Sequence, residues 1–161
     1  MLGRRSIAEV IDHASAFVQA LADVTGTVVD LGSGGGVPGL VIARARLDLR
    51  LLLVDRRSAR TDHLTRLVRR LELGDRVTVV NADVGELEIS PPADAAVARG
   101  FGSPAVTLQA AARLVRPGGL IVVSEPPEDH AGRWDSRPAT VEAMPSPDSR
   151  VAVFHVKPEG P

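Results

Sequence analysis

Short β-branched runs alternate with longer segments of helical periodicity along most of this chain. Strands that are joined by helices pair in parallel, with right-handed crossovers between them. The sequence therefore predicts an α/β fold with a doubly wound, mostly parallel sheet. The expected strands are Thr27–Leu31, Leu51–Val54, Val77–Val80, Asp94–Ala98 and Leu120–Val123, and the expected helices are Ser6–Ala22, Pro38–Arg46, Ser58–Leu73 and Ser103–Val115.

Local signals set the predicted helix boundaries. Ser6 and Glu9 form the S-x-x-E pattern of a capping box at the start of the first helix. Gly74 is expected to end the third helix, and the Ser103-Pro104 pair to begin the fourth. A Pro-Gly-Gly turn at 117–119 is expected to lead into the fifth strand. The residues expected to face the core from the first helix are Ile7, Val10, Ile11, Ala14, Phe17, Val18 and Leu21.

The last part of the chain departs from this alternation. A proline-rich stretch, 126–138, precedes two strand-like runs, Thr140–Met144 and Val151–Lys157. The segment between these runs is too short for a crossover helix, so they are expected to form an antiparallel hairpin. We expect one domain over 1–161, with an N-terminal helix in 1–26, a cofactor-binding core in 27–125, and a loop and hairpin in 126–161.

Composition narrows the classes of function. The chain has three Phe, one Trp and no Tyr, so its core must be aliphatic and it has few rings for stacking bases. Its formal net charge of −1 provides no general attraction to nucleic acid. The absence of Cys excludes disulfides and thiolate metal sites, and the four His are too scattered to predict a metal centre. No apolar run is long enough to span a membrane, and no secretory signal is recognisable, so a cytoplasmic protein is expected.

The segment 28–39 reads Val-Val-Asp-Leu-Gly-Ser-Gly-Gly-Gly-Val-Pro-Gly and lies between a predicted strand and a predicted helix. Glycines at this place let the backbone turn sharply and approach a nucleotide-type ligand at a helix N-terminus. Gly34, Gly36 and Gly39 also satisfy the G-x-G-x-x-G dinucleotide pattern, with Asp55 about 20 residues beyond Gly34. Two cofactors therefore fit this loop, S-adenosylmethionine and a nicotinamide dinucleotide.

Asp30 favours S-adenosylmethionine, because a carboxylate at this strand end suits the ammonium of a methionine moiety better than a pyrophosphate. The residues after Lys157 are also too few for the substrate domain of a dehydrogenase. Asp55 ends the second strand, where a carboxylate can accept hydrogen bonds from ribose hydroxyls. Asn81 and Asp83 follow the third strand, where an adenine ring would lie, although Asn and Asp are also common turn residues.

Two motifs resemble the RsmG (GidB) methyltransferases, a bacterial family that methylates guanine N7 in small-subunit ribosomal RNA. The first is Asp-Leu-Gly-Ser-Gly-Gly-Gly-Val-Pro-Gly-Leu at 30–40, with its unusual Val-Pro-Gly end. The second is Pro-Pro-Ala-Asp-Ala-Ala-Val-Ala-Arg-Gly-Phe-Gly-Ser at 91–103, which is similar to the fourth-strand motif of the family. The segment 114–119 resembles the entry to the fifth strand in class I methyltransferases generally.

The resemblance implies a set of cofactor contacts. It implicates Gly32 and Val37 in the glycine loop, Val84 and Gly85 after the third strand, and Arg99 at the end of the fourth. Class I geometry adds Asp30, Gly34 and Asp55, and the sequence position adds Asp83. A guanidinium at the position of Arg99 can bind the cofactor carboxylate or orient an acceptor, and its alternative is a surface arginine paired with an acid. No proton-transfer residue is expected, since guanine N7 has a lone pair and no proton to lose.

The methyl acceptor stays open at this point. Ribosomal RNA is the acceptor that the resemblance implies, but the family has a longer helical region, with an Asn-Leu-Thr motif, before the first strand. The alternatives are a relative that binds the cofactor without catalysis, a methyltransferase of a small metabolite, and a nicotinamide oxidoreductase. The oligomeric state is not predicted.

Although the chain as a whole has a net charge of −1, basic residues recur at helical spacing in one segment. Arg56, Arg60, His63, Arg66 and Arg70 recur every three to four residues, with further arginines beside them. On a helix they would lie opposite an apolar side formed by Leu64, Leu67, Val68 and Leu71. A solvated helix face is one interpretation of this stripe, and a surface that follows phosphates is the other.

Overall fold

The computed structural model describes residues 6–128, 131–158 and 160. The helices in this part of the chain are α1 (Ile7–Ala20), α2 (Gly39–Ala45), α3 (Ser58–Arg70) and α4 (Pro104–Leu114). The strands are β1 (Gly26–Leu31), β2 (Leu49–Asp55), β3 (Val77–Asn81), β4 (Ala93–Ala98), β5 (Val115–Ser124), β6 (Val141–Met144) and β7 (Val151–Val156).

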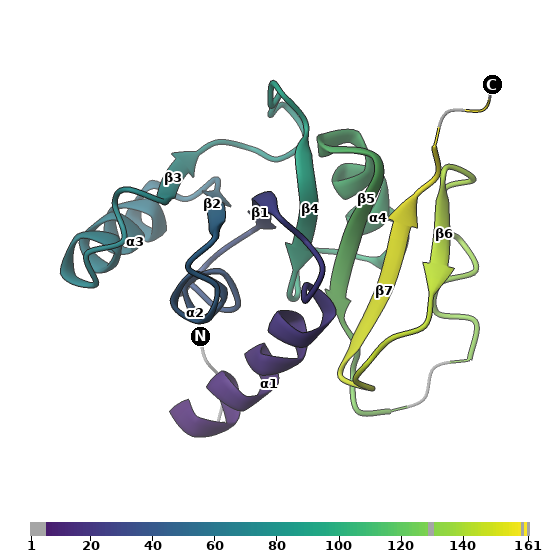
Figure 1. Ribbon diagram of the computed structural model, residues 1–161, viewed down its shortest axis with the longest axis horizontal. Coiled ribbons are helices and arrows are strands. Elements are labelled where there is room, and N and C mark those ends of the chain that lie inside the picture. The colour runs from purple at the N-terminus through teal and green to yellow at the C-terminus, as the bar shows by residue number, and fades with distance from the viewer. Residues whose placement is uncertain (1–5, 129–130, 159, 161) are drawn as a thin grey trace.

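The strands form one seven-stranded sheet in the order β3-β2-β1-β4-β5-β7-β6 (Figure 1). Strands β1 to β5 pair in parallel, whereas β7 pairs antiparallel with both β5 and β6. The predicted α/β fold, its parallel sheet and its terminal hairpin are therefore confirmed. The chain reverses its direction of winding between β1 and β4, which lie side by side although two strands separate them in sequence.

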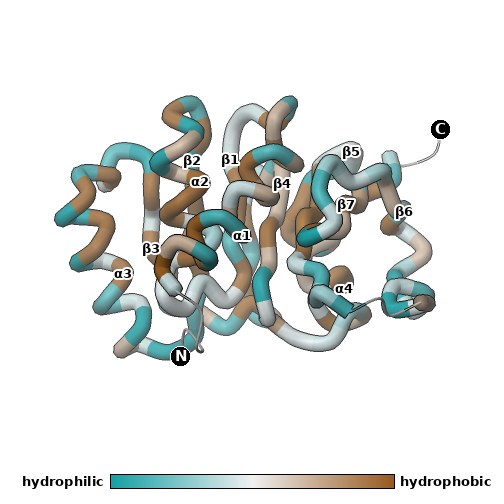
Figure 2. The backbone as a smooth tube through the Cα atoms, turned by 90° about the horizontal axis from the view of Figure 1, so that it is seen from below, coloured by the Kyte–Doolittle hydropathy of each residue, from teal (hydrophilic) through white to brown (hydrophobic). Residues whose placement is uncertain are grey.

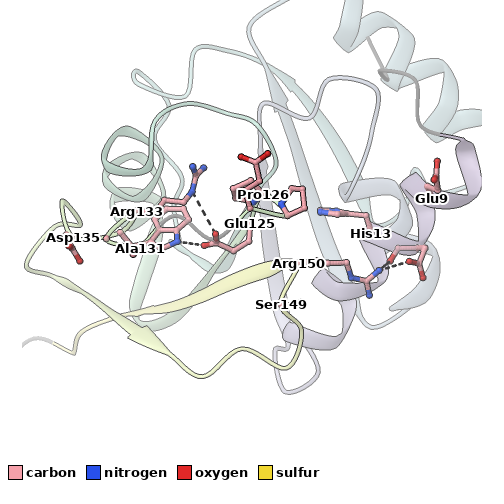
Figure 3. A pocket seen from close by; sticks show the side chains of 14 residues that line it. Glu9, His13, Glu125, Pro126, Ala131, Arg133, Asp135, Ser149 and Arg150 are labelled. Atoms are coloured by element: carbon pink, nitrogen blue, oxygen red, sulfur yellow. Dashed lines mark hydrogen bonds and ion pairs between the residues drawn. The ribbon is translucent and has the colours of Figure 1, made fainter.

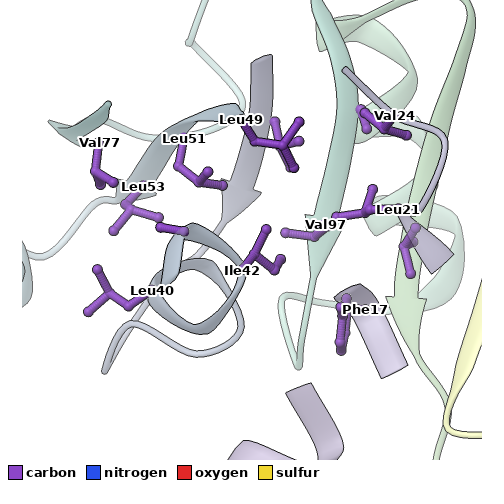
Figure 4. Packing of buried hydrophobic residues seen from close by; sticks show 14 of the residues in the cluster. Phe17, Leu21, Val24, Leu40, Ile42, Leu49, Leu51, Leu53, Val77 and Val97 are labelled. Atoms are coloured by element: carbon purple, nitrogen blue, oxygen red, sulfur yellow. The ribbon is translucent and has the colours of Figure 1, made fainter. Parts of the chain in front are cut away.

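Helices cover both faces of the sheet. On one face, α1, α2 and α3 pack a cluster that includes Phe17, Ile42 and Leu64 against the strands. On the other face, Leu108, with its neighbours on α4, packs a second cluster. Figure 4 shows part of the first cluster, in which side chains of α1 and α2 meet those of β2 and β4. Figure 2 shows long hydrophobic stretches in α2 and the central strands, while α3 alternates between hydrophilic and hydrophobic residues.

The first helix begins as predicted but faces the core with fewer residues. The Ser6 hydroxyl accepts from the amide of Glu9, and the Glu9 carboxylate accepts from the amide of Ser6, so the capping box is confirmed. Ile7 and Ile11 were expected to face the core, and this is wrong, since they are 75% and 50% exposed. The buried side of α1 is a single stripe formed by Val10, Ala14, Phe17 and Leu21. Ile7 and Ile11 lie beside this stripe, and the described elements do not cover them.

The helix α3 ends at Arg70 with Leu71 as its C-cap, and the left-handed residue that follows is Glu72, in place of the predicted Gly74. Its φ of 55° lies in the left-handed region. The amide of Leu73 donates to the carbonyl of Val68, and the amide of Glu72 donates to the carbonyl of Arg69. These two bonds are those of a Schellman motif, in which the residue after the C-cap is left-handed. In α3 that residue is Glu72, two positions before Gly74. The glycine was the best local signal, but the apolar contact of buried Leu73 decides where the helix stops.

Two further boundaries differ in detail. The fifth strand was predicted over Leu120–Val123, but β5 begins at Val115, and its register with β4 shifts between Ala93 and Ala95. The Pro-Gly-Gly segment therefore forms an irregularity inside the strand instead of a turn before it. Ser103 is the N-cap of α4 with Pro104 following, as predicted, although its side chain makes no capping hydrogen bond.

Candidate functional site

The ends of the parallel strands bring most of the predicted site residues to one edge of the sheet. Leu31, the last residue of β1, pairs with Val54 of β2 on one side and with Ala98 of β4 on the other. The glycine loop therefore leaves β1 between Asp55 at the end of β2 and Arg99 directly after β4. In open α/β sheets, ligands bind at this edge, where the winding reverses.

The glycine loop turns because three of its glycines have positive φ. The φ angles of Gly32, Gly34 and Gly36 are 69°, 52° and 94°, which side-chain-bearing residues rarely adopt. Ser33 fixes the turn from within, since its amide donates to the carbonyl of Val54 and its hydroxyl donates to the carbonyl of Asp30. The loop is thus held against the ends of two strands before α2 begins at Gly39.

Asp30 is buried beneath the loop. Its Oδ2 accepts a hydrogen bond from the amide of Gly39 at 3.0 Å, at the first turn of α2. Burial raises the pKa of the Asp30 carboxyl to about 7, against the opposing influence of the Gly39 amide, Ser33 and the positive charge of Arg99. The carboxyl is 1% exposed and lines none of the hollows described below, so its contact with a cofactor stays a prediction.

Asp55 joins the glycine loop to the start of α3. Its Oδ2 accepts from the amide of Gly34 at 3.0 Å, and its Oδ1 accepts from the amide of Arg57 at 2.9 Å. The guanidinium of Arg60 lies 3.4 Å from Oδ2. Unlike Asp30, this carboxylate lines a hollow, and its Oδ1 has one lone pair beyond that which the Arg57 amide uses.

Two adjacent hollows lie at this edge. One, which we call the Asp55 hollow, has a volume of about 270 Å³. The other, the Arg99 hollow, has a volume of about 540 Å³. The Asp55 hollow is lined by Gly32, Asp55, Arg56, Arg57, Arg60, Ala82, Asp83, Val84, Gly100, Phe101 and Val106, and the Arg99 hollow by Gly32, Ser33, Gly34, Gly35, Val37, Ala59, Arg60, His63, Arg99 and Gly100.

Most of the predicted contacts thus lie around one or other of these hollows. Gly85 lines neither hollow. Its amide donates to the Asp83 carboxylate in the turn after β3, so its contribution is to hold Asp83. Asn81 lines neither as well, since its side chain donates to the carbonyl of Asp55. Phe101 was given no role from the sequence, although it stands in the second family motif. A Cβ atom at Gly32 would lie 3.0 Å from its ring, so Phe101 limits the space beside the loop.

A third and larger hollow, the Trp134 hollow, lies at the same edge beyond β5. Its volume is about 920 Å³, and α1 forms one of its walls (Figure 3). The indole N–H of Trp134 donates to the Glu125 carboxylate, and the guanidinium of Arg133 lies over the indole ring. Of the residues that the structure describes, five carboxylates line this hollow together with two arginines and His13; the carboxylates are those of Glu9, Asp12, Glu125, Glu128 and Asp135.

Within the described ranges, no group of three or more His, Asp or Glu side chains is placed to hold a metal ion. None of the helices within those ranges is long and apolar enough to cross a membrane.

Comparison with known proteins relates the chain to one family. The family model for rRNA small subunit methyltransferase G (GidB) matches residues 3–131. The ribosomal RNA small subunit methyltransferase G of Rhizorhabdus wittichii is 34% identical over 140 residues, which are 82% of this chain and 64% of that protein. The protein of the same name from Acidothermus cellulolyticus is 36% identical over 107 residues, 66% of this chain and 47% of that protein. The chain therefore spans less than two thirds of the length of these relatives.

Solved structures agree with the fold. A SAM-dependent methyltransferase from Geobacter sulfurreducens, in complex with S-adenosyl-L-homocysteine, superposes with a TM-score of 0.62 at 26% identity, covering 78% of this chain and 57% of that one. A putative S-adenosyl-L-methionine-dependent methyltransferase from Methanococcus maripaludis gives a TM-score of 0.72 at 16% identity, covering 96% of this chain and 90% of that one. The second likeness concerns the fold alone.

Proposed function

Because the chain belongs to the rRNA small subunit methyltransferase G (GidB) family, we propose that it transfers a methyl group from S-adenosylmethionine to an acceptor. The observation that carries this proposal is the meeting of the glycine loop with Asp55 and Arg99 where the sheet reverses its winding. The Asp55 and Arg99 hollows at this place are the proposed cofactor site. S-adenosylmethionine supplies the electrophilic methyl group on its sulfonium.

The residues around the two hollows fit this cofactor. Asp55 would accept from a ribose hydroxyl, since its carboxylate lines a hollow and its Oδ1 keeps one unused lone pair. Asp83 and Val84 would border the adenine on the side of β3. Gly32 suits close approach by the ligand, because a side chain there would fill the space up to Phe101.

Arg99 is proposed as a positioning residue. It lines the Arg99 hollow beside Gly34 and Val37, and a guanidinium can hold the carboxylate of a methionine moiety through two parallel hydrogen bonds. Asp30 would attract the methionine ammonium from beneath the loop. The protein contributes position and electrostatics to such a reaction, and we assign no residue to proton transfer.

We propose small-subunit ribosomal RNA as the acceptor, because the two relatives are named for it. The cytoplasm is accordingly the proposed compartment, and one domain over 1–161 the proposed functional unit. The positive charges of Arg56, Arg57 and Arg60, which line the Asp55 hollow, also support an anionic acceptor.

Calorimetric titration with S-adenosylhomocysteine tests the cofactor, with NADH titrated in parallel. We expect binding of the first and none of the second, and Arg99→Ala should weaken the first by about 1–3 kcal/mol, the usual cost of losing a charged hydrogen-bond partner. The exposed Arg44, which lines none of the three hollows, provides the matched control, Arg44→Ala. Tight NADH binding without a response to S-adenosylhomocysteine would overturn the proposal.

Transfer of labelled methyl groups tests the acceptor. Small ribosomal subunits, protein-free ribosomal RNA and a small-molecule extract are offered separately with the labelled cofactor. Label in ribosomal RNA supports the proposed acceptor, and label in the extract alone identifies a small-molecule methyltransferase. Cofactor binding without transfer to any of the three identifies a binding protein.

A further inference from the structure

Six arginines lie close together on and before α3. We call Arg56, Arg57, Arg60, Arg66, Arg69 and Arg70 the arginine surface. Asp62 is the one acidic residue among 56–70, although the whole chain has a net charge of −1. Five of the six side chains are exposed, and Arg60 is half-buried. Six of the 19 Lys and Arg residues of the chain are thus gathered on and directly before one helix at the outer edge of the sheet, beside β3 (Figure 1).

Many of the other arginines in the described ranges have structural partners, although Arg44, Arg50 and Arg99 make no side-chain hydrogen bond or ion pair there. Arg46 donates to the carbonyls of Leu21 and Val24, and Arg76 donates to that of Ala43. Arg113 donates to the carbonyls of Val84 and Leu87. On the arginine surface, by contrast, Arg60 has its ion pair with Asp55, and the other five side chains make no hydrogen bond or ion pair within the described ranges. Holding the fold together therefore does not explain these five.

Cations of the arginine surface are close neighbours on the helix. Arg66 and Arg70 are four residues apart on α3, and Arg66 and Arg69 are three apart, so their like charges repel. Arg69 and Arg70 also lie in the last turn, where the helix dipole favours positive charge. A bound polyanion would offset the repulsion among these side chains.

The arginine surface begins at the proposed cofactor site. Arg56 and Arg57 line the Asp55 hollow, and Arg60 lines both that hollow and the Arg99 hollow. From there, Arg66, Arg69 and Arg70 continue to the other end of the helix. At a rise of 1.5 Å per residue, the surface extends for about 20 Å. It is long enough to contact several groups of an extended polyanion whose acceptor lies in the hollows.

The other side of the cofactor site has the opposite charge. Among the described residues, five carboxylates line the Trp134 hollow beyond β5, together with Arg133, Arg150 and His13. Arg150 is already paired with Asp12 and Asp148. A phosphate backbone would be repelled there and attracted along α3.

From these observations we infer that the arginine surface binds the phosphate backbone of the RNA whose acceptor base enters the cofactor hollows. RNA is the polyanion because of the proposed function, on which this inference rests. The contacts would be made with phosphates and would carry no sequence preference, so they position the strand instead of selecting it. Affinity should fall as salt rises, by about 0.7 units of logarithmic slope for each phosphate contact with a single strand.

Fluorescence anisotropy with a labelled fragment of small-subunit ribosomal RNA tests this inference. The variant Arg66→Gln/Arg70→Gln removes two charges that line none of the three hollows. The variant Arg44→Gln/Arg50→Gln removes two exposed arginines outside α3 and serves as the charge-matched control. Circular dichroism confirms that each variant is folded, and S-adenosylhomocysteine is titrated against each.

The α3 variant should lower the salt slope by about 1.4 units and weaken RNA binding at least about tenfold at low salt. The control should retain the salt slope of the unaltered chain, and both variants should bind S-adenosylhomocysteine normally. Equal loss of RNA binding in the two variants, or no loss in the α3 variant, would overturn the inference. Binding to vesicles of anionic lipid in preference to RNA would also overturn it. Failure of S-adenosylhomocysteine binding in the unaltered chain would count against the proposed function alone.

Discussion

The amide of Gly34 donates a hydrogen bond to Oδ2 of Asp55 at 3.0 Å, which ties the loop after β1 to the end of β2. Oδ1 of the same carboxylate accepts from the amide of Arg57, just before α3. One nearly buried side chain therefore fixes both the glycine loop and the start of α3. Because this carboxylate is also the proposed ribose ligand, local folding and cofactor binding should be coupled.

Replacing Asp55 with Ala should reduce both properties. S-adenosylhomocysteine binding should weaken by about 1–3 kcal/mol, since the ribose hydroxyls lose a charged acceptor. The free energy of unfolding should fall by a similar amount of about 1–3 kcal/mol, because two backbone amides lose their acceptor. Calorimetry and urea denaturation measure the two effects. The control is Asp62→Ala, an exposed acid on α3, which should change stability by less than about 0.5 kcal/mol. A folded Asp55→Ala protein with unchanged affinity would place the ribose elsewhere.

Two adjacent glycines should respond differently to the same substitution. A Cβ atom at Gly36 would overlap the Leu40 side chain and lie 3.2 Å from Leu64, and the φ of 94° disfavours any side chain. Gly36→Ala should therefore lower the free energy of unfolding by about 1–3 kcal/mol. At Gly35 no atom lies within 4 Å of the added carbon, so Gly35→Ala should stay within about 0.5 kcal/mol. Equal urea midpoints for the two variants would contradict this packing of the loop.

The parts of the fold that local patterns specify could be predicted from the sequence. Alternating strands and helices imply parallel pairing, and parallel pairing brings the ends of β1, β2 and β4 to one edge. The approximate position of Asp55 followed from this relation, whereas Arg99 was singled out by the family motif that places it after the fourth strand. The two family motifs then favoured S-adenosylmethionine over a nicotinamide dinucleotide as the cofactor.

Features that depend on distant packing could not be predicted in this way. The exposure of Ile7 and Ile11 depends on which side of α1 packs against α2, β5 and β7. The place of Phe101 beside Gly32 depends on how two loops from non-adjacent parts of the sequence approach each other. The burial of Asp30 under the amide of Gly39 is of the same kind, since it requires the full turn of the loop. A periodicity shows which side of an element is apolar, but not what covers it.

Glu72 offers a test of the helix ending that the sequence did not predict. Its φ of 55° is strained for a residue with a side chain, whereas glycine adopts it readily. Glu72→Gly should therefore raise the free energy of unfolding by about 0.5–1 kcal/mol, measured by urea denaturation. Glu72→Ala keeps the strain and serves as the control, so it should bring no such gain. A loss of stability in the glycine variant would show that this residue is not left-handed in solution.

The buried carboxyl of Asp30 should make stability depend on pH. Burial raises its pKa in the folded protein to about 7, from an ordinary value of 3.8. Between these two pH values the folded state binds a proton at Asp30 that the unfolded state has released. The contribution of Asp30 to stability therefore falls as pH rises from about 4 through 7, by an amount on the order of 3–4 kcal/mol.

Asp30→Asn isolates this effect, because the amide oxygen can still accept from Gly39 but the side chain no longer titrates. The variant should melt at the higher temperature at both pH 5 and pH 8, and its advantage should be clearly larger near pH 8, since most of the stability linked to Asp30 is lost between these two pH values. The same proteins test the proposed attraction between Asp30 and the methionine ammonium. Near pH 8 the unaltered protein should bind S-adenosylhomocysteine more tightly than the variant, and near pH 5 this advantage should vanish, because the carboxyl is then protonated. Parallel melting profiles would mean that Asp30 is ionised throughout this range, and affinities that stay equal at both pH values would place the ammonium away from it.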